Sequence, residues 1–323
     1  MDRKTVKKVI FVCITMILIG LILYSGLRIL ESTVFYMEPD QWVQDRKTIV
    51  RDGVRYYPRQ DITTVMVLGI NRRGPVEPTA FNEGGAADMI TLVVFDEKEE
   101  NYSILSINRD SMMDIPVLME NGKIDGSFFG QAGYAHTYGT GMEDSCENTQ
   151  RAISNFLGGI GIDYYVALNM DAISILNDAV GGVTVTVKDD FSLVDPSLQK
   201  GEITLSGEQA VNFVQARKGV GDSLNVSRIQ RQQEYMESFL KALDAGRKKD
   251  AAFVLKIYEK LSGYIVSNCS ANVISGMLDR YGSYTLKENV TPEGKNVVGE
   301  YMEYHVDAEK LDELAVRLFY APK

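Results

Sequence analysis

The sequence predicts an α/β domain with helices on both faces of its sheet, preceded by one apolar N-terminal segment. Of the 323 residues, 45% are hydrophobic and 24% are charged, as in ordinary globular domains. After residue 61, strand and helix patterns follow each other without a repeat, a low-complexity tract or a Pro/Gly-rich linker. We therefore expect one domain at 61–323, with a core at 61–245 and a helical and strand extension at 246–323.

The apolar segment at 9–27 carries no charged residue. As a helix it would span about 28 Å, which matches the hydrocarbon thickness of a bilayer. Basic residues at 3–8 precede it, so we expect a cytoplasmic tail at 1–8 and the remaining chain outside. A cleaved signal peptide is the alternative, but its apolar core would be shorter, and no A-x-A site follows. The sequence thus predicts a single-pass protein of the cell membrane with an extracytoplasmic stalk at 28–60.

Three β-rich runs open the domain. The first, at 61–70, ends near a glycine and is followed by a polar loop, and the next two lie at 89–95 and 102–107. The short polar turn at 96–101 favours antiparallel pairing of the last two runs.

Helical patterns dominate the rest of the chain. Gly181 and Gly182 end one helical pattern, and Ser206 with Glu208 begins another. We expect helices at 143–158, 172–180, 206–213, 229–243, 251–264, 271–281 and 307–318, and strands at 164–168, 183–187, 283–289 and 300–305.

Charge and metal-ligand content exclude several functions. The formal net charge of −10 opposes a broad attraction to nucleic acid, so no nucleic-acid partner is expected. With only two histidines, His136 and His305, the sequence argues against a histidine-built zinc site. Cys146 and Cys269 show no metal-ligand spacing, and whether they form a disulfide stays open. A bound metal is therefore expected to be a hard cation on oxygen ligands.

Arginine and aspartate residues lie at the ends of the predicted strands. Arg72 follows the first strand, Asp88 precedes the second, and Arg109 and Asp110 follow the third. Ligands usually bind at strand ends in such sheets. Arginine binds phosphate oxygens in a bidentate manner, and the two carboxylates are suited to a magnesium ion that bridges a pyrophosphate.

A second basic group consists of Arg217, Arg228 and Arg231. The last two fall at or near a predicted helix start, where backbone amides also favour anions. The alternative is that each arginine–aspartate pair is an ordinary ion pair of little consequence. Spacing alone thus indicates an extracytoplasmic α/β domain with a phosphate site.

Aromatic pairs recur between these motifs, among them Phe128 with Phe129 and Tyr164 with Tyr165. We expect these side chains to pack in the core. A lipid-lined groove is the alternative for them.

Five motifs occur in a fixed order along the chain. They are VMVLGINRR (65–73), GAADMITLVVFD (85–96), ILSINRDSMMDIP (104–116), IGIDYYVALNMDAISILNDAVGGVTVTV (160–187) and LSGEQAVNFVQARKGVGDSLNVSRIQRQQ (205–233). Together they resemble the LytR-CpsA-Psr family of cell-wall glycopolymer transferases, and the resemblance covers 61–245.

The resemblance implies an α/β/α sandwich with a mixed central sheet and an apolar tunnel for a polyprenyl chain. It implies a magnesium-dependent phosphotransferase that moves a glycopolymer from a polyprenyl pyrophosphate carrier to peptidoglycan. A hydrolase of the same lipid pyrophosphate, and a non-catalytic protein that binds or senses the lipid-linked polymer, are the alternatives.

The resemblance also assigns roles to individual residues. Asp88, Arg109 and Asp110 match catalytic positions, and the implied magnesium ligands are Asp88, Asn71 and Asp110. The implied pyrophosphate-binding residues are Arg72, Lys123, Arg217, Arg228, Arg231 and Gln232.

The chain departs from the family pattern at several of these motifs. Asn71 stands where the family has a metal-binding aspartate, and Gln215 replaces an arginine. Alanines at 86–87 replace Arg-Ser, Asn108 replaces a proline, and Asn225 stands near where an aspartate is common. A neutral ligand at Asn71 predicts weaker magnesium binding, and with it reduced activity or a different polymer.

Overall fold

The computed structural model describes residues 48–51, 53–250, 252–299 and 301–322. The predicted cytoplasmic tail, the membrane anchor at 9–27 and most of the stalk lie outside the described residues. Within the described ranges, no helix is both long and apolar enough to cross a membrane.

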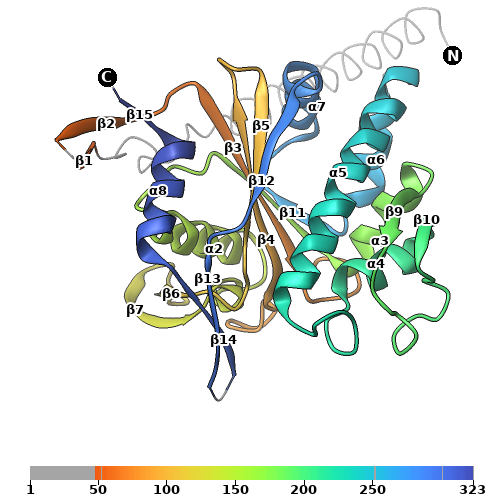
Figure 1. The fold of residues 1–323 in the computed structure, drawn as a ribbon, viewed down its shortest axis with the longest axis horizontal. Coiled ribbons are helices and arrows are strands. Elements are labelled where there is room, and N and C mark those ends of the chain that lie inside the picture. Colours follow the sequence, from red (N-terminus) through yellow and green to blue (C-terminus); the bar gives the residue numbers. More distant parts are fainter. Residues whose placement is uncertain (1–47, 52, 251, 300, 323) are drawn as a thin grey trace, which may run out of the picture. The chain divides into compact units, whose positions relative to one another are not determined.

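A six-stranded mixed sheet forms the centre of the domain (Figure 1). Its strand order is β11 (Ile265–Ser267), β8 (Tyr164–Asn169), β3 (Ile62–Ile70), β4 (Ala87–Asp96), β5 (Asn101–Ile107) and β12 (Thr285–Val290). Strand β4 pairs antiparallel with β3 and with β5, as the short turn at 96–101 predicted for the β4–β5 pair. Strands β8 and β12 pair parallel with β3 and β5 respectively, so the sheet is mixed.

Alternate residues of β3 face opposite sides of this sheet. Met66 and Leu68 are fully buried in a core cluster that includes residues of α2 (Glu143–Phe156) and α8 (Ala308–Phe319). Val65 and Val67 face the other side, which a second group of helices covers (Figure 1). This group consists of α3 (Met170–Ala179), α4 (Gly207–Gln215), α5 (Asn225–Lys249), α6 (Phe253–Leu261) and α7 (Ala271–Tyr281).

Short strands outside the central sheet form hairpins and join the two ends of the described chain. They are β1 (Ile49–Arg51), β2 (Val54–Pro58), β6 (Met112–Leu118), β7 (Ile124–Gln131), β9 (Val183–Val187), β10 (Gly201–Leu205), β13 (Gly294–Val298), β14 (Met302–Val306) and β15 (Tyr320–Pro322). The 3-10 helix η2 (Ala132–Thr137) follows β7. Strand β2 pairs with β15, so the described end of the predicted stalk is hydrogen-bonded to the C-terminal strand.

Most helices lie where the sequence predicts them. Ser206 begins α4 in a capping box with Gln209, which satisfies free backbone donors of the first turn. The helix predicted at 229–243 is longer in the structure, where α5 covers Asn225–Lys249. The sequence did not predict its first and last turns, because they are largely polar and carry no apolar pattern. Cys146 and Cys269, whose pairing the sequence left open, are free and buried thiols.

The hairpin of β6 and β7 has no counterpart among the predicted elements. Strand β7 pairs only with β6 among the described strands, so its other edge is unpaired, and most of its residues are exposed. Phe129 on this strand is 61% exposed, and the prediction that it packs in the core is wrong. For Tyr165, which is buried in the central core cluster, the same prediction is confirmed.

Candidate active site

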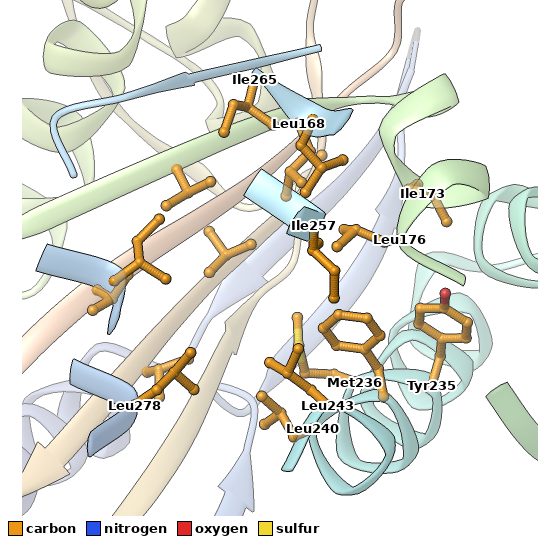
Figure 2. Close-up of a pocket in the computed structure, with 18 of the residues that line it drawn as sticks. Leu168, Ile173, Leu176, Tyr235, Met236, Leu240, Leu243, Ile257, Ile265 and Leu278 are labelled. Carbon is orange, nitrogen blue, oxygen red and sulfur yellow. The ribbon is translucent and has the colours of Figure 1, made fainter. Parts of the chain in front are cut away.

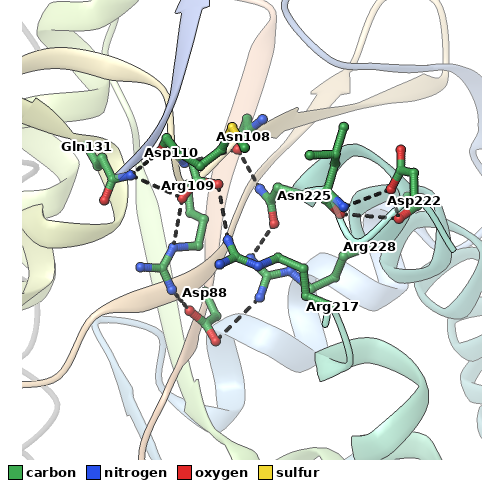
Figure 3. Close-up of polar contacts among 12 residues, drawn as sticks. Asp88, Asn108, Arg109, Asp110, Gln131, Arg217, Asp222, Asn225 and Arg228 are labelled. Carbon is green, nitrogen blue, oxygen red and sulfur yellow. Dashed lines mark hydrogen bonds and ion pairs between the residues drawn. The ribbon is translucent and has the colours of Figure 1, made fainter. Parts of the chain in front are cut away.

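Pairing of β4 with β5 brings together residues that the sequence places at separate strand ends. Ile90 pairs with Ile107, so the start of β4 and the end of β5 lie at the same edge of the sheet. The Arg109 guanidinium is paired with the Asp88 carboxylate, and Nε of Arg109 lies 3.5 Å from Oδ1 of Asp110 (Figure 3). Three of the predicted site residues therefore meet at one place in the fold.

Two further arginines reach these carboxylates from the segment around the start of α5. Nη1 of Arg217 lies 3.3 Å from Oδ2 of Asp110, and Nη1 of Arg228 lies 3.6 Å from Oδ2 of Asp88 (Figure 3). Three guanidinium groups therefore face two carboxylates, and the formal charge of the group is plus one. We call Asp88, Arg109, Asp110, Arg217 and Arg228 the guanidinium cluster.

The guanidinium cluster is largely withdrawn from solvent. Asp88, Asp110 and Arg228 are 7%, 2% and 3% exposed. Burial lowers the pKa of Arg228 to about 10, against the opposing effect of Asp88, so this side chain stays charged at neutral pH. Burial also raises the pKa of Asp110 above its ordinary value, although the neighbouring arginines oppose that change. Nε of Arg228 is buried without a hydrogen-bond partner among the described residues, so the cluster retains a donor for an anion.

Gly133, at the start of η2, lies directly against Arg109. Its backbone N–H donates to the carbonyl oxygen of Arg109 at 2.9 Å. A Cβ atom at this position would come within 2.8 Å of the Ala87 carbonyl oxygen and 3.3 Å of Nε of Arg109. The absence of a side chain thus lets η2 support the arginine closely. Gly133 was not among the site residues predicted from the sequence.

Gln131 and the hairpin of β13 and β14 support Asp110 from another side. Nε2 of Gln131 lies 3.4 Å from Oδ1 of Asp110 and donates to the Met302 carbonyl at 2.6 Å. The Tyr304 N–H donates to the Asp110 carbonyl at 2.8 Å. The C-terminal extension therefore helps to build the site. Gln131 is the last residue of β7. Its position at a strand end would have marked it as a site candidate, but β7 was not predicted.

An apolar cavity of about 480 Å³ (Figure 2) shares Asp88 with the guanidinium cluster. Asp88, Gln215 and Gln232 contribute polar groups to its lining. Most of its wall is aliphatic or aromatic and includes Leu168, Ile173, Leu176, Tyr235, Met236, Leu240, Leu243, Ile257, Ile265 and Leu278. Because Asp88 belongs both to the cluster and to the cavity wall, the arrangement suits a ligand with an anionic head and a long apolar tail.

Comparison with known proteins identifies the family of this fold and site. The model of the LytR_cpsA_psr family matches residues 33–319. The chain belongs to this family. The fold that the sequence predicted, mixed α/β with a mixed central sheet, is that of solved family structures.

Curated relatives of the LytR_cpsA_psr family are similar over part of their length. TagT of Bacillus subtilis is 31% identical over 191 residues, which cover 57% of this chain and 53% of that protein. TagU of Halalkalibacterium halodurans is 30% identical over 225 residues, covering 69% of this chain and 65% of that protein. Both are named polyisoprenyl-teichoic acid–peptidoglycan teichoic acid transferases. The matched segments thus span between about half and two thirds of these relatives.

Solved structures of TagT share the fold over most of the described domain. A crystal structure of Bacillus subtilis TagT is 25% identical, with a TM-score of 0.60 over 80% of this chain and 90% of that chain. The structure titled "TagT bound to LI-WTA" is 24% identical, with a TM-score of 0.63 over the same shares. A third TagT structure has bound octaprenyl pyrophosphate lipid; it is 24% identical, with a TM-score of 0.58 over 80% of this chain and 89% of that chain.

Two positions that the family resemblance assigns to pyrophosphate have other surroundings here. The Arg72 side chain packs beside Gly85 and Gly141, next to the pocket that His136 also lines. Lys123 is exposed in the turn between β6 and β7. Among the contacts of the described residues, none joins Arg72 or Lys123 to the guanidinium cluster.

Arg231 and Gln232 have different surroundings, although they are adjacent in the sequence. Arg231 donates to Asp189 at 2.8 Å and to the Phe213 carbonyl at 3.0 Å, and its guanidinium lies 5.4 Å from the ring centre of Phe191. These contacts join α5 to the core around β9 and α4. Gln232 instead lines the cavity. Of this predicted pair, the structure therefore brings only Gln232 to the candidate site.

Asn71 lies beside the start of β4, near Asp88. Its N–H donates to the Ala86 carbonyl at 3.0 Å, and its Oδ1 lies 3.4 Å from Nε2 of Gln215, another departure from the family pattern. No group of three or more His, Cys, Asp or Glu residues is arranged to hold a metal in the part of the chain that the structure describes. An amide and a carboxylate oxygen at one sheet edge nevertheless fit magnesium, which commonly completes its shell with substrate phosphates and water.

Proposed function

We propose that this protein transfers a glycopolymer from a polyprenyl pyrophosphate carrier to peptidoglycan. The observation that carries the proposal is the guanidinium cluster, with its formal charge of plus one, at the edge of an apolar cavity. The names of the TagT and TagU relatives support it, as does the octaprenyl pyrophosphate in a solved TagT structure.

The two parts of the site bind different parts of this donor. Arg109, Arg217 and Arg228 bind the pyrophosphate oxygens and stabilise the charge that develops during transfer. The cavity encloses the polyprenyl tail, whose burial provides affinity at about 25 cal/mol per Å² of apolar surface. No nucleotide is required, because the energy is stored in the pyrophosphate bond.

The transfer step exchanges one phosphorus–oxygen bond for another. The acceptor hydroxyl oxygen of peptidoglycan bonds to the phosphorus that carries the glycopolymer. The bond from that phosphorus to the bridging oxygen breaks, and polyprenyl phosphate leaves with the electron pair. Asp88, at the junction of cluster and cavity, accepts the hydroxyl proton.

We propose magnesium as the cofactor, held by Asp88 and Asn71 together with substrate phosphates. When bound, such an ion supplies further neutralisation of the pyrophosphate charge. Asp110 is the third predicted ligand. Because Asp110 is 2% exposed and, unlike Asp88, does not line the cavity, we assign it to holding Arg109 and Arg217 in place.

We also propose that the protein is a single-pass membrane protein with its domain outside the cell. The uncharged run at 9–27 and the basic residues before it support this orientation. A lipid-borne donor suits such a location, since the domain would then meet the carrier at the membrane surface. Helices on both faces of the sheet support the α/β/α sandwich that the resemblance implied (Figure 1).

A product assay tests the proposal. The full chain is incubated in detergent micelles with magnesium, a polyprenyl-pyrophosphate glycan and a peptidoglycan oligomer, and products are identified by mass spectrometry. A joined glycan–peptidoglycan product that is lost in Asp88→Ala and in Arg109→Ala is the expected result. Released glycan phosphate without joined product would make the protein a hydrolase. Binding of the donor without turnover would make it a receptor for the lipid-linked polymer.

A further inference from the structure

Asn108 and Asn225 form a hydrogen-bond relay beside the guanidinium cluster. Asn108 directly follows β5, and Asn225 is the first residue of α5. Both side chains are buried. Nδ2 of Asn225 donates to Oδ1 of Asn108 at 2.5 Å, a contact between segments that lie 117 residues apart in the sequence (Figure 3).

The two ends of the relay fix its direction. The backbone N–H of Asp110 donates to Oδ1 of Asn108 at 3.0 Å, so that oxygen is an acceptor. At the other end, Nη2 of Arg228 donates to Oδ1 of Asn225. A backbone amide and a guanidinium can only donate, so Nδ2 of Asn225 must be the donor between the two side chains.

We infer that Asn225 is a positioning residue for Arg228. Asn225 holds the guanidinium at a set distance from the strand end that carries Arg109 and Asp110. Because the oxygen that contacts Arg228 is neutral, the positive charge of Arg228 remains available to the substrate. Without the hydrogen bond to Asn225, the ion pair with Asp88 at 3.6 Å would be the one polar contact of Arg228 left among the described residues. The inference rests on the proposed binding of pyrophosphate by Arg228.

The two asparagine side chains are complementary at their contact. Oδ1 of Asn108 supplies the acceptor, and Nδ2 of Asn225 supplies the donor.

The test measures the Kd of inorganic pyrophosphate for the full chain in detergent micelles by isothermal titration calorimetry. Asn225→Asp places an acceptor against Oδ1 of Asn108, whereas Asn108→Asp keeps the acceptor that the relay needs. The two variants are nearly isosteric and add the same charge. We expect Kd to rise about tenfold in Asn225→Asp and less than about threefold in Asn108→Asp.

Two further variants separate the relay from charge and folding. Asn225→Ala removes the relay without adding charge and is expected to raise Kd about fivefold. Asn121→Asp adds the same charge in the exposed β6–β7 turn and should bind as wild type does. Loss of folded protein would lower the number of binding sites per chain and leave Kd unchanged.

Equal Kd values for Asn225→Asp and Asn108→Asp, or an unchanged Kd in Asn225→Ala, would overturn the positioning role. If the wild-type chain itself binds no pyrophosphate, the proposed function fails, which is a separate result.

Discussion

Arg228 and Arg231 lie about one turn apart on α5 but have opposite surroundings. Arg231 is bonded to Asp189 and to two backbone carbonyls, and it stacks on Phe191. Arg228 lies 3.6 Å from Asp88 and donates to Oδ1 of Asn225, but its Nε has no hydrogen-bond partner among the described residues. A guanidinium whose donors are satisfied by the protein holds the fold together, whereas one with a donor to spare is available to an anionic ligand.

Arg228→Ala tests the ligand-binding side of this comparison and should have the largest effect. We expect kcat/KM for glycopolymer transfer to fall by about 10²–10³-fold, the range for loss of one preorganised charge-stabilising donor. The melting temperature should fall less than in Arg231→Ala, because Asp88 keeps its pair with Arg109 and one buried oxygen, Oδ1 of Asn225, loses its donor. Initial rates and thermal unfolding measure the two effects. A loss of stability without a loss of turnover per folded molecule would place Arg228 with the structural arginines.

Arg231→Ala tests the structural side. It should lower the free energy of unfolding by about 3 kcal/mol, because Asp189 and two backbone carbonyls lose their donor. Urea unfolding measures this change, and turnover per folded molecule should remain near wild type. A stable variant that no longer binds pyrophosphate would instead put Arg231 in the site, as the family resemblance implied.

His136 is a second buried polar group that the fold satisfies, and it predicts a pH dependence. Its Nδ1 lies 3.0 Å from the Gly85 carbonyl oxygen, and burial lowers its pKa from 6.5 to about 4. Below pH 6.5 the unfolded chain takes up a proton that the folded chain does not. Stability should therefore be complete above pH 6.5 and fall by about 3 kcal/mol as the pH approaches 4.

Urea unfolding of wild type and His136→Gln across this pH range measures the effect. The variant should lack this component of the pH dependence. Identical slopes in the two proteins would show that His136 does not titrate as its burial implies.

Leu240→Trp extends the comparison to the apolar half of the site. The larger side chain would occupy part of the cavity that Leu240 lines, so KM for a long polyprenyl donor should rise about tenfold. The Kd of inorganic pyrophosphate should not change. Leu255→Trp, at an exposed position of α6, is the matched control. A parallel loss of pyrophosphate binding would mean that the substitution distorts the cluster and does not merely narrow the cavity.

Gly133→Ala should have the smallest effect, about a fivefold loss of kcat/KM. The added Cβ would lie 2.8 Å from the Ala87 carbonyl oxygen, so η2 must move away from Arg109. Gly276→Ala, where an added Cβ meets nothing within 4 Å, is the control and should retain wild-type rates. Steady-state rates of both variants give the comparison, and equal rates would remove Gly133 from the support of Arg109.

The sequence was sufficient for the elements whose signals are local. The β-rich runs at 61–107 predicted β3, β4 and β5, and the turn at 96–101 predicted the antiparallel pairing of β4 with β5, which places Asp88 beside Arg109. The same local reasoning grouped Arg228 with Arg231, since both lie on one basic segment. It could not separate them, because their partners come from distant strands and loops.

Long-range contacts explain most of what the sequence did not reveal. The bond from Gln131 to the Met302 carbonyl crosses 171 residues, and the Asn108–Asn225 bond crosses 117. No periodicity or spacing rule encodes such pairs. Strand β7 also escaped prediction, because two glycines interrupt its apolar pattern and most of its residues are exposed.

The central claim is that the guanidinium cluster and the apolar cavity bind one ligand. Its most direct test compares the Kd values of a polyprenyl pyrophosphate, inorganic pyrophosphate and a polyprenyl alcohol for the full chain, measured side by side. We expect polyprenyl pyrophosphate to bind tightest. Arg228→Ala should weaken the binding of the two pyrophosphates only, and Leu240→Trp should weaken the binding of the two polyprenyl compounds only. Equal affinity for polyprenyl and inorganic pyrophosphate would contradict the central claim, because the cavity would then contribute nothing to the binding of the donor.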